Sequence, residues 1–140
     1  TESPVFKRGL EWTLGMQSRG GGYGAFDAEN TLELWNKIPF ADMEAMIDPP
    51  TEDLTGRLCE LMGMLHLQPD DPRLRAARGY LRRTQRDDGS WWGRWGVNYI
   101  YGTWSVIAGL RAVGARDDED MIARGCGFLR GYQNDDGGFG

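Results

Sequence analysis

Residues 85–104, QRDDGSWWGRWGVNYIYGTW, decide how the rest of the chain is interpreted. A glutamine ends an expected helix, an acidic turn with a glycine follows, and six aromatic residues are then interspersed with glycines. Aromatic side chains bury a large area, and the glycines let rings approach the backbone closely. The stretch therefore predicts a turn that is anchored in a core by its aromatic side chain, and we expect Trp91 to have that structural role.

The glutamine turn occurs three times, at residues 17–23, 85–91 and 133–139. In each copy a glycine follows the glutamine by four positions and an aromatic residue follows it by six. The first two glutamines are 68 positions apart and the last two are 48 apart, so we expect an insertion in the first repeat, around residues 27–50. An internal repeat of this kind indicates stacked supersecondary units.

Apolar periodicity predicts an all-α fold, and no alternating strand pattern is present. The predicted helices span residues 4–17, 52–66, 71–85, 99–113 and 117–132. A more apolar helix at 99–113 precedes a more polar one that ends near the next glutamine, which favours paired helices in a toroid or solenoid. Residues 31–50 contain three prolines and much apolar side-chain area, and we interpret them as a long ordered loop.

Composition excludes several classes of protein. A net charge of −5 without clustered basic residues does not favour nucleic-acid binding. Cys59 and Cys126 fall in predicted helices and are expected to be small apolar residues rather than a disulfide or a metal site. No apolar run reaches the ~18 residues of a membrane-spanning helix. Because the chain starts without Met and ends inside its third repeat, we expect residues 1–140 to be part of one domain of a longer protein.

The repeated turn resembles the QW motif of triterpene cyclases, which are α/α-toroid enzymes. Two longer blocks are more specific: residues 21–27 continuing through 38–42 to 48–55, and residues 89–103, both resemble bacterial squalene–hopene cyclases. The resemblance covers essentially the whole chain. It implies an α/α toroid of helical hairpins and an acid-initiated cationic cyclisation of squalene to hopene or hopanol, with no cofactor and no metal ion.

The resemblance also implies roles for three aromatic residues. Phe26 matches a cavity aromatic that is Tyr in some relatives, and Trp95 and Tyr101 match aromatics that line or brace the substrate cavity. A π face attracts a carbocation without forming a bond to it. These three residues are therefore the candidates for stabilising cations.

Three charged residues match positions near the proton donor of the family. They are Asp48, Asp53 and Arg57, and Arg57 departs from a His that increases the acidity of the donor. A guanidinium could act similarly, since a nearby cation favours carboxylate ionisation. Alternatively, Asp53 caps its helix and Arg57 is a surface residue paired with Glu60 or Asp53. The family's Asp-x-Asp-Asp acid motif does not occur here, so we expect these 140 residues alone to be inactive.

Other functions remain as alternatives. An oxidosqualene cyclase is disfavoured by Asn98, where that branch typically has Cys. A prenyltransferase-like enzyme would need zinc ligands, and His66 is the only histidine. A non-catalytic helical repeat would display a polar inner face, whereas residues 99–113 are largely apolar. The resemblance further implies squalene as the partner, a homodimer, and monotopic attachment to the bacterial cytoplasmic membrane.

Overall fold

The computed structural model describes residues 3–30 and 47–139. Within these ranges the chain forms helices, and its only bridge-type pairings join Gln17 to Tyr23 and Tyr23 to Thr51. The predicted all-α class is therefore confirmed. The helices are α1 (Pro4–Gly15), α2 (Glu52–Met64), α3 (Pro72–Thr84), α4 (Asn98–Val113), the short 3-10 helix η3 (Arg116–Asp118) and α5 (Glu119–Gly131).

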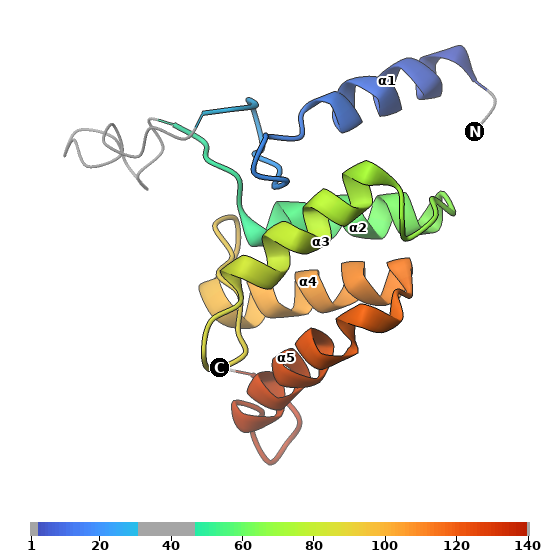
Figure 1. The fold of residues 1–140 in the computed structure, drawn as a ribbon. Helices are drawn as coiled ribbons and strands as arrows, with labels where there is room; N and C mark the ends of the chain where they lie inside the picture. The colour runs from blue at the N-terminus through green and yellow to red at the C-terminus, as the bar shows by residue number, and fades with distance from the viewer. Residues whose placement is uncertain (1–2, 31–46, 140) are drawn as a thin grey trace.

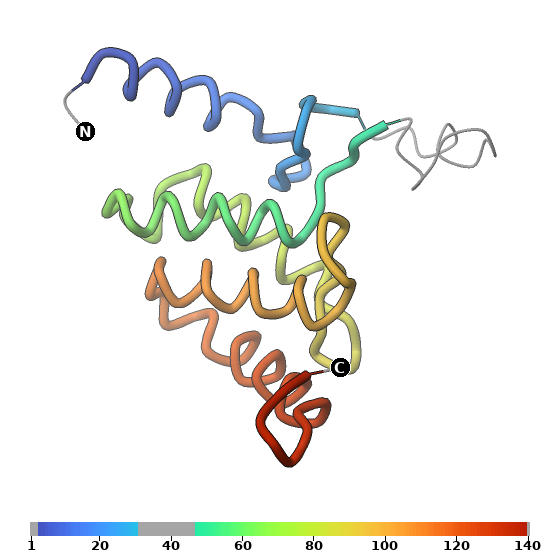
Figure 2. Tube along the Cα trace, turned by 180° about the vertical axis from the view of Figure 1, so that it is seen from behind, coloured from blue at the N-terminus to red at the C-terminus, as the bar shows by residue number. Residues whose placement is uncertain are grey.

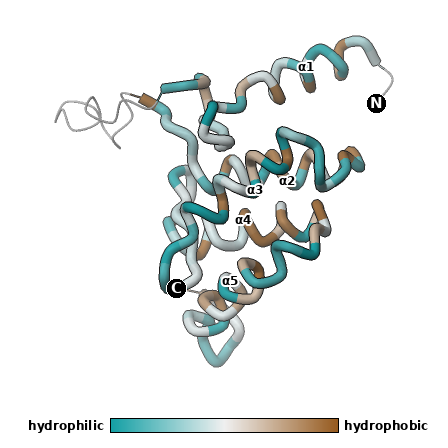
Figure 3. The backbone as a smooth tube through the Cα atoms, viewed as in Figure 1, coloured by the Kyte–Doolittle hydropathy of each residue, from teal (hydrophilic) through white to brown (hydrophobic). Residues whose placement is uncertain are grey.

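The helices form two layers. The helices α2 and α4 share the largest interface, with α3 against α2 and α5 against α4 (Figure 1). Seen from behind, α2 and α4 lie in front of α3 and α5 (Figure 2). Hydrophobic residues are frequent along α4, whereas α3 carries long hydrophilic stretches (Figure 3). This arrangement confirms the expected alternation of a more apolar helix with a more polar one that ends in glutamine.

The helices α2 and α4 touch through small residues. A Cβ atom at Gly109 would clash with the carbonyl oxygen of Gly56, and one at Gly63 would lie 2.5 Å from the carbonyl carbon of Ala112. Such close contact allows the neighbouring large side chains to interdigitate at interior density. The resulting core is apolar and includes Cys59, Met62, Leu74, Leu81, Trp91, Val106, Leu110, Met121 and Ile122.

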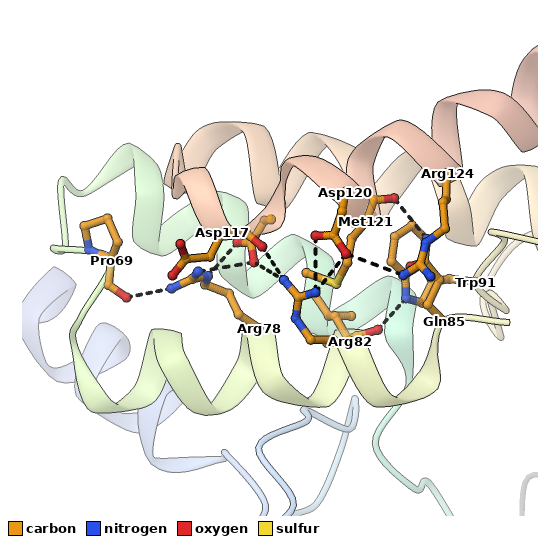
Figure 4. A network of polar contacts seen from close by, with 11 residues as sticks. Pro69, Arg78, Arg82, Gln85, Trp91, Asp117, Asp120, Met121 and Arg124 are labelled. Atoms are coloured by element: carbon orange, nitrogen blue, oxygen red, sulfur yellow. Dashed lines mark hydrogen bonds and ion pairs between the residues drawn. The ribbon is translucent and has the colours of Figure 1, made fainter. Parts of the chain in front are cut away.

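Each of the first two glutamines joins the helix that it follows to a later helix: Gln17 joins the end of α1 to α3, and Gln85 joins the end of α3 to α5. The Nε2 atom of Gln85 donates to the glycine carbonyl of its own turn and to the carbonyl of Met121 in the first turn of α5, both at 2.9 Å (Figure 4). Gln17 does the same with its own turn and with Arg73 in the first turn of α3. Gln133 closes its own turn at 2.8 Å. The helix before the first turn ends at Gly15 rather than at the predicted residue 17, since Gln17 belongs to the turn.

The aromatic residues of the first two turns are buried in equivalent ways. Tyr23 and Trp91 are at most 1% exposed, and their backbone N–H groups donate to the hydroxyls of Thr55 and Thr103 respectively. The first pair is 32 positions apart and the second 12, so the first repeat contains 20 additional residues in the predicted place. Of the expected loop at 31–50, residues 31–46 lie outside the described residues, as does the block at 38–42.

An ion-pair network also joins α3 to η3 and α5. Arg78 donates to Asp118 at 2.6 and 3.2 Å and to the Pro69 carbonyl at 3.0 Å, and Arg82 pairs with Asp120 at 3.0 Å (Figure 4). Asp118 is 1% exposed, so its charge is compensated almost entirely by protein groups. This network and the Gln85 contacts fix α5 against α3. The sequence analysis did not predict the network.

Candidate functional site

Two of the three predicted cavity aromatics lie against each other. The rings of Phe26, in the turn after Tyr23, and Trp95, in the segment before α4, have centroids 5.6 Å apart and planes at 90°. This edge-to-face geometry is favourable for aromatic pairs. Phe26 is 73% exposed and Trp95 41%, so both rings retain surface that another molecule can contact.

Asp48 holds the backbone of Phe26. Its Oδ2 atom accepts a hydrogen bond of 2.8 Å from the Phe26 N–H and another from the Ala25 N–H. Asp48 is only 7% exposed. Hydrogen bonds to a charged acceptor are stronger than neutral ones, so the carboxylate fixes the turn that presents the Phe26 ring.

Asp53 holds the backbone of Trp95 in a similar way. It is fully buried in the first turn of α2, and its Oδ2 atom accepts a hydrogen bond of 3.1 Å from the Trp95 N–H. The helix dipole stabilises a negative charge at this position. No hydrogen bond to its Oδ1 atom exists within the described residues. The acid therefore links α2 to the segment before α4, and one buried oxygen is left for a further interaction.

Arg94 lies between these two anchored segments. Its side chain is 9% exposed, its Nη2 atom donates to the Ile47 carbonyl at 3.2 Å, and its Nε atom lies 4.0 Å from Asp48 Oδ1. Sequence reasoning missed Arg94. The available signal was a single basic residue inside the aromatic segment 91–95.

Arg57 lies one turn after Asp53 on α2. Its guanidinium pairs with Glu60 at 2.8 Å and lies 4.3 Å from the ring centroid of Trp104. The charged partner that the structure gives Arg57 is thus Glu60, which is the surface pairing considered above. An effect of Arg57 on the acidity of a proton donor stays a prediction. Trp104, which is 47% exposed, was also missed by the sequence analysis.

Tyr101 braces the segment before α4. A Cβ atom at Gly93 would lie 2.7 Å from the Tyr101 ring, and one at Gly96 would clash with that ring, so only glycine fits at both positions. The ring centroid of Tyr101 is 6.2 Å from that of Trp104. These aromatics belong to an apolar pocket of about 350 Å³ lined by Val97, Ile100, Tyr101, Trp104 and Phe139.

A third acid lies beside Asp53. Burial, with a smaller contribution from the charge of Asp53, raises the pKa of Glu52 to about 7. Among residues 3–30 and 47–139, no group of three His, Cys, Asp or Glu side chains is placed to hold a metal ion. None of the helices described is long and apolar enough to cross a membrane.

Comparison of the sequence with known proteins identifies a family. The family model of the squalene–hopene cyclase C-terminal domain matches residues 1–140. The squalene–hopene cyclase of Zymomonas mobilis is 48% identical over 133 residues, which are 95% of this chain. That of Alicyclobacillus acidocaldarius is 49% identical over 107 residues, or 76% of this chain. The dammaradiene synthase of Dryopteris crassirhizoma is 43% identical over 136 residues, or 91%.

The chain spans about a fifth of the length of these curated relatives, with 20%, 17% and 20% of each covered. The two-layered helical hairpins are accordingly a segment of the α/α toroid of this family. The match of the family model over the whole chain and the high identities lead to the same conclusion: this chain belongs to the squalene–hopene cyclase C-terminal domain family.

Proposed function

We propose that this chain forms part of the cavity wall of a squalene–hopene cyclase, which converts squalene to hopene or hopanol in hopanoid biosynthesis. The observation that carries the proposal is the exposed edge-to-face pair of Phe26 and Trp95, whose backbones are held by the buried acids Asp48 and Asp53. The names of the relatives from Zymomonas and Alicyclobacillus support the choice of substrate.

The chemistry requires an acid and a surface that does not react with cations. A proton added to a terminal double bond of squalene creates a tertiary carbocation. The π electrons of the next double bond form a ring by attacking this cation, which leaves a new cation for the following double bond to attack. The final cation loses a proton to give hopene, or it adds water and then loses a proton from the added water to give hopanol. Aromatic faces stabilise the cations without trapping them, and an apolar wall keeps water out until the last step.

We assign the roles of this chain's residues as follows. Phe26, Trp95 and Tyr101 present π faces to the cations. Asp48 and Asp53 position the first two of these residues, and the unpaired buried oxygen of Asp53 is available to the proton-donor group or to a developing cation. The assignment of Arg57 to tuning the donor is supported only by its place one turn from Asp53.

Two alternatives are less well supported. Oxidosqualene as substrate would require the same π faces, and the high identity to squalene–hopene cyclases favours squalene. A non-catalytic repeat is disfavoured because the pocket beside α4 is lined by apolar side chains. The dammaradiene synthase match indicates that products differ among similar chains, so the ratio of products has to be measured.

We also propose that the complete protein is a homodimer bound monotopically to the bacterial cytoplasmic membrane. The support for membrane contact is chemical: squalene is a hydrocarbon that dissolves in membranes rather than in water, so an enzyme that uses it gains access by contacting the bilayer. The homodimer is proposed from the resemblance to the family alone. Fractionation of cells into membrane and soluble portions, followed by cross-linking, tests both parts.

The decisive experiment uses the complete reading frame that encodes this chain. The protein is expressed with membranes, squalene and oxidosqualene are supplied separately, and products are detected by gas chromatography. Hopene or hopanol from squalene is the expected result. Turnover of oxidosqualene alone would identify the alternative substrate, and turnover of neither would contradict the proposal.

A further inference from the structure

We propose that Arg94 is a positioning residue, which sets the geometry of the Phe26–Trp95 pair by compensating the charge of Asp48. This role follows from contacts within the chain. It rests on the proposed function only where it predicts a change in the cyclisation products.

Arg94, Asp48, Phe26 and Trp95 are linked to one another by successive contacts. Arg94 is the direct neighbour of Trp95, and its guanidinium reaches the 47–48 segment through the Ile47 carbonyl and Asp48 Oδ1. Asp48 Oδ2 accepts a hydrogen bond from the N–H of Phe26, and the ring centroid of Phe26 lies 5.6 Å from that of Trp95. The guanidinium carbon also lies 6.0 Å from the Trp95 ring centroid. One side chain therefore connects the backbones that carry both rings.

Within the described residues Asp48 Oδ1 accepts no hydrogen bond, so its 4.0 Å contact with Arg94 is electrostatic, and burial strengthens it. The side chains of Arg94 and Asp48 are each 9% exposed, so water screens their interaction poorly. Removing one partner of a buried pair leaves an uncompensated charge in a medium of low polarity. Without Arg94, Asp48 would regain solvation by moving outward, and its hydrogen bonds to Ala25 and Phe26 would move with it. The position of the Phe26 ring is thus coupled to the charge of Arg94.

This coupling predicts that neutralising Asp48 compensates for the loss of Arg94. In the double variant Arg94→Met with Asp48→Asn, the asparagine oxygen can still accept the Phe26 N–H, and neither member of the pair carries a charge. A role in general stability alone predicts that two changes in one buried cluster are at least as harmful as one. The exposed pair of Arg111 and Glu119 offers a matched control, Arg111→Met.

The experiment places 5-fluorotryptophan at position 95 alone in the complete protein and records its fluorine NMR signal. We expect Arg94→Met to shift or split the signal, Arg94→Lys to do so less, Arg111→Met to leave it unchanged, and the double variant to return it toward the wild-type position. A signal that does not change in Arg94→Met, or one that is no closer to wild type in the double variant, overturns the proposal.

Folding failure is also informative. If Arg94→Met does not fold and the double variant does, the electrostatic coupling is supported; if neither folds, the proposal is overturned. In a protein that cyclises squalene, the share of incompletely cyclised products should rise about tenfold in Arg94→Met, within the range expected for misplacing a reacting group by about 1 Å. This ratio does not depend on the amount of folded enzyme. Absence of squalene turnover in the wild type would contradict the proposed function, while the fluorine signal would still decide the role of Arg94.

Discussion

Asp53, in the first turn of α2, accepts a hydrogen bond of 3.1 Å from the backbone N–H of Trp95, 42 positions further along the chain. The acid is fully buried, and its second oxygen has no hydrogen-bond partner within the described residues. One carboxylate thus combines two properties: it holds an aromatic residue of the candidate site, and it keeps an acceptor free. Substitutions at Asp53 can separate these two properties.

Asp53→Asn and Asp53→Ala should therefore differ. Asparagine keeps an acceptor for the Trp95 N–H, so we expect little change in the unfolding temperature and a lower kcat because the charge is lost. Alanine leaves the partly buried Trp95 N–H without its acceptor, which costs up to about 1–3 kcal/mol. Thermal unfolding and squalene turnover of the complete protein measure both effects. Equal unfolding temperatures for the two variants would show that the hydrogen bond does not hold Trp95.

Gln85→Ala tests the contact between α3 and α5. It removes the two hydrogen bonds that Gln85 donates to Gly89 and Met121 and the one that it accepts from Arg124, and it should destabilise the protein by about 1–3 kcal/mol. Gln133→Ala removes the exposed hydrogen bond to Gly137 and should cost about 0.5–1.5 kcal/mol or less. Denaturant unfolding of both variants gives the comparison, and a larger effect at Gln133 would contradict the expectation.

Gly89→Ala and Gly137→Ala separate backbone strain from steric overlap. Both glycines have positive φ, +86° and +87°, which costs about 1–2 kcal/mol for an alanine. At Gly89 the added Cβ would also lie 2.6 Å from the carbonyl oxygen of Arg124, whereas at Gly137 the nearest atom is 3.9 Å away. Overpacking adds about 1–3 kcal/mol at Gly89. Stability measured by urea unfolding should fall further for Gly89→Ala, and equal losses would mean that α5 moves away at little cost.

Glu52→Gln should change the dependence of stability on pH. Burial raises the pKa of Glu52 from 4.5 to about 7, so between these values the folded protein binds more protons than the unfolded chain. The contribution of Glu52 to the free energy of unfolding is then fully present below about pH 4.5 and falls as the pH rises through about 7. In Glu52→Gln the free energy of unfolding should not show this decline, so the variant should be more stable than the wild type above about pH 7.

Unfolding midpoints measured across the same pH range check the effect of Glu52. Glu11→Gln, on an exposed part of α1, is the control and should keep the wild-type slope. If Glu52→Gln also keeps that slope, the Glu52 side chain is hydrated and its pKa is not raised in solution.

Local sequence signals determined much of the fold. Apolar periodicity placed α2 to α5 within two residues of their observed bounds, and the spacing from Gln85 to Trp91 predicted a turn whose aromatic residue is buried. These features depend on interactions between residues a few positions apart, which the sequence displays directly. The resemblance to a family then singled out Phe26 and Trp95, which the structure brings into contact.

Only the tertiary structure decided which groups those residues touch. The acids Asp48 and Asp53 accept backbone N–H groups of the two aromatics, Arg57 pairs with Glu60, and Arg94 reaches the 47–48 segment. Most of these contacts join segments more than 20 positions apart, and their geometry follows from how closely α2 packs on α4. A sequence shows which side chains are present, whereas their partners depend on the packed backbones that bring distant segments within hydrogen-bonding distance.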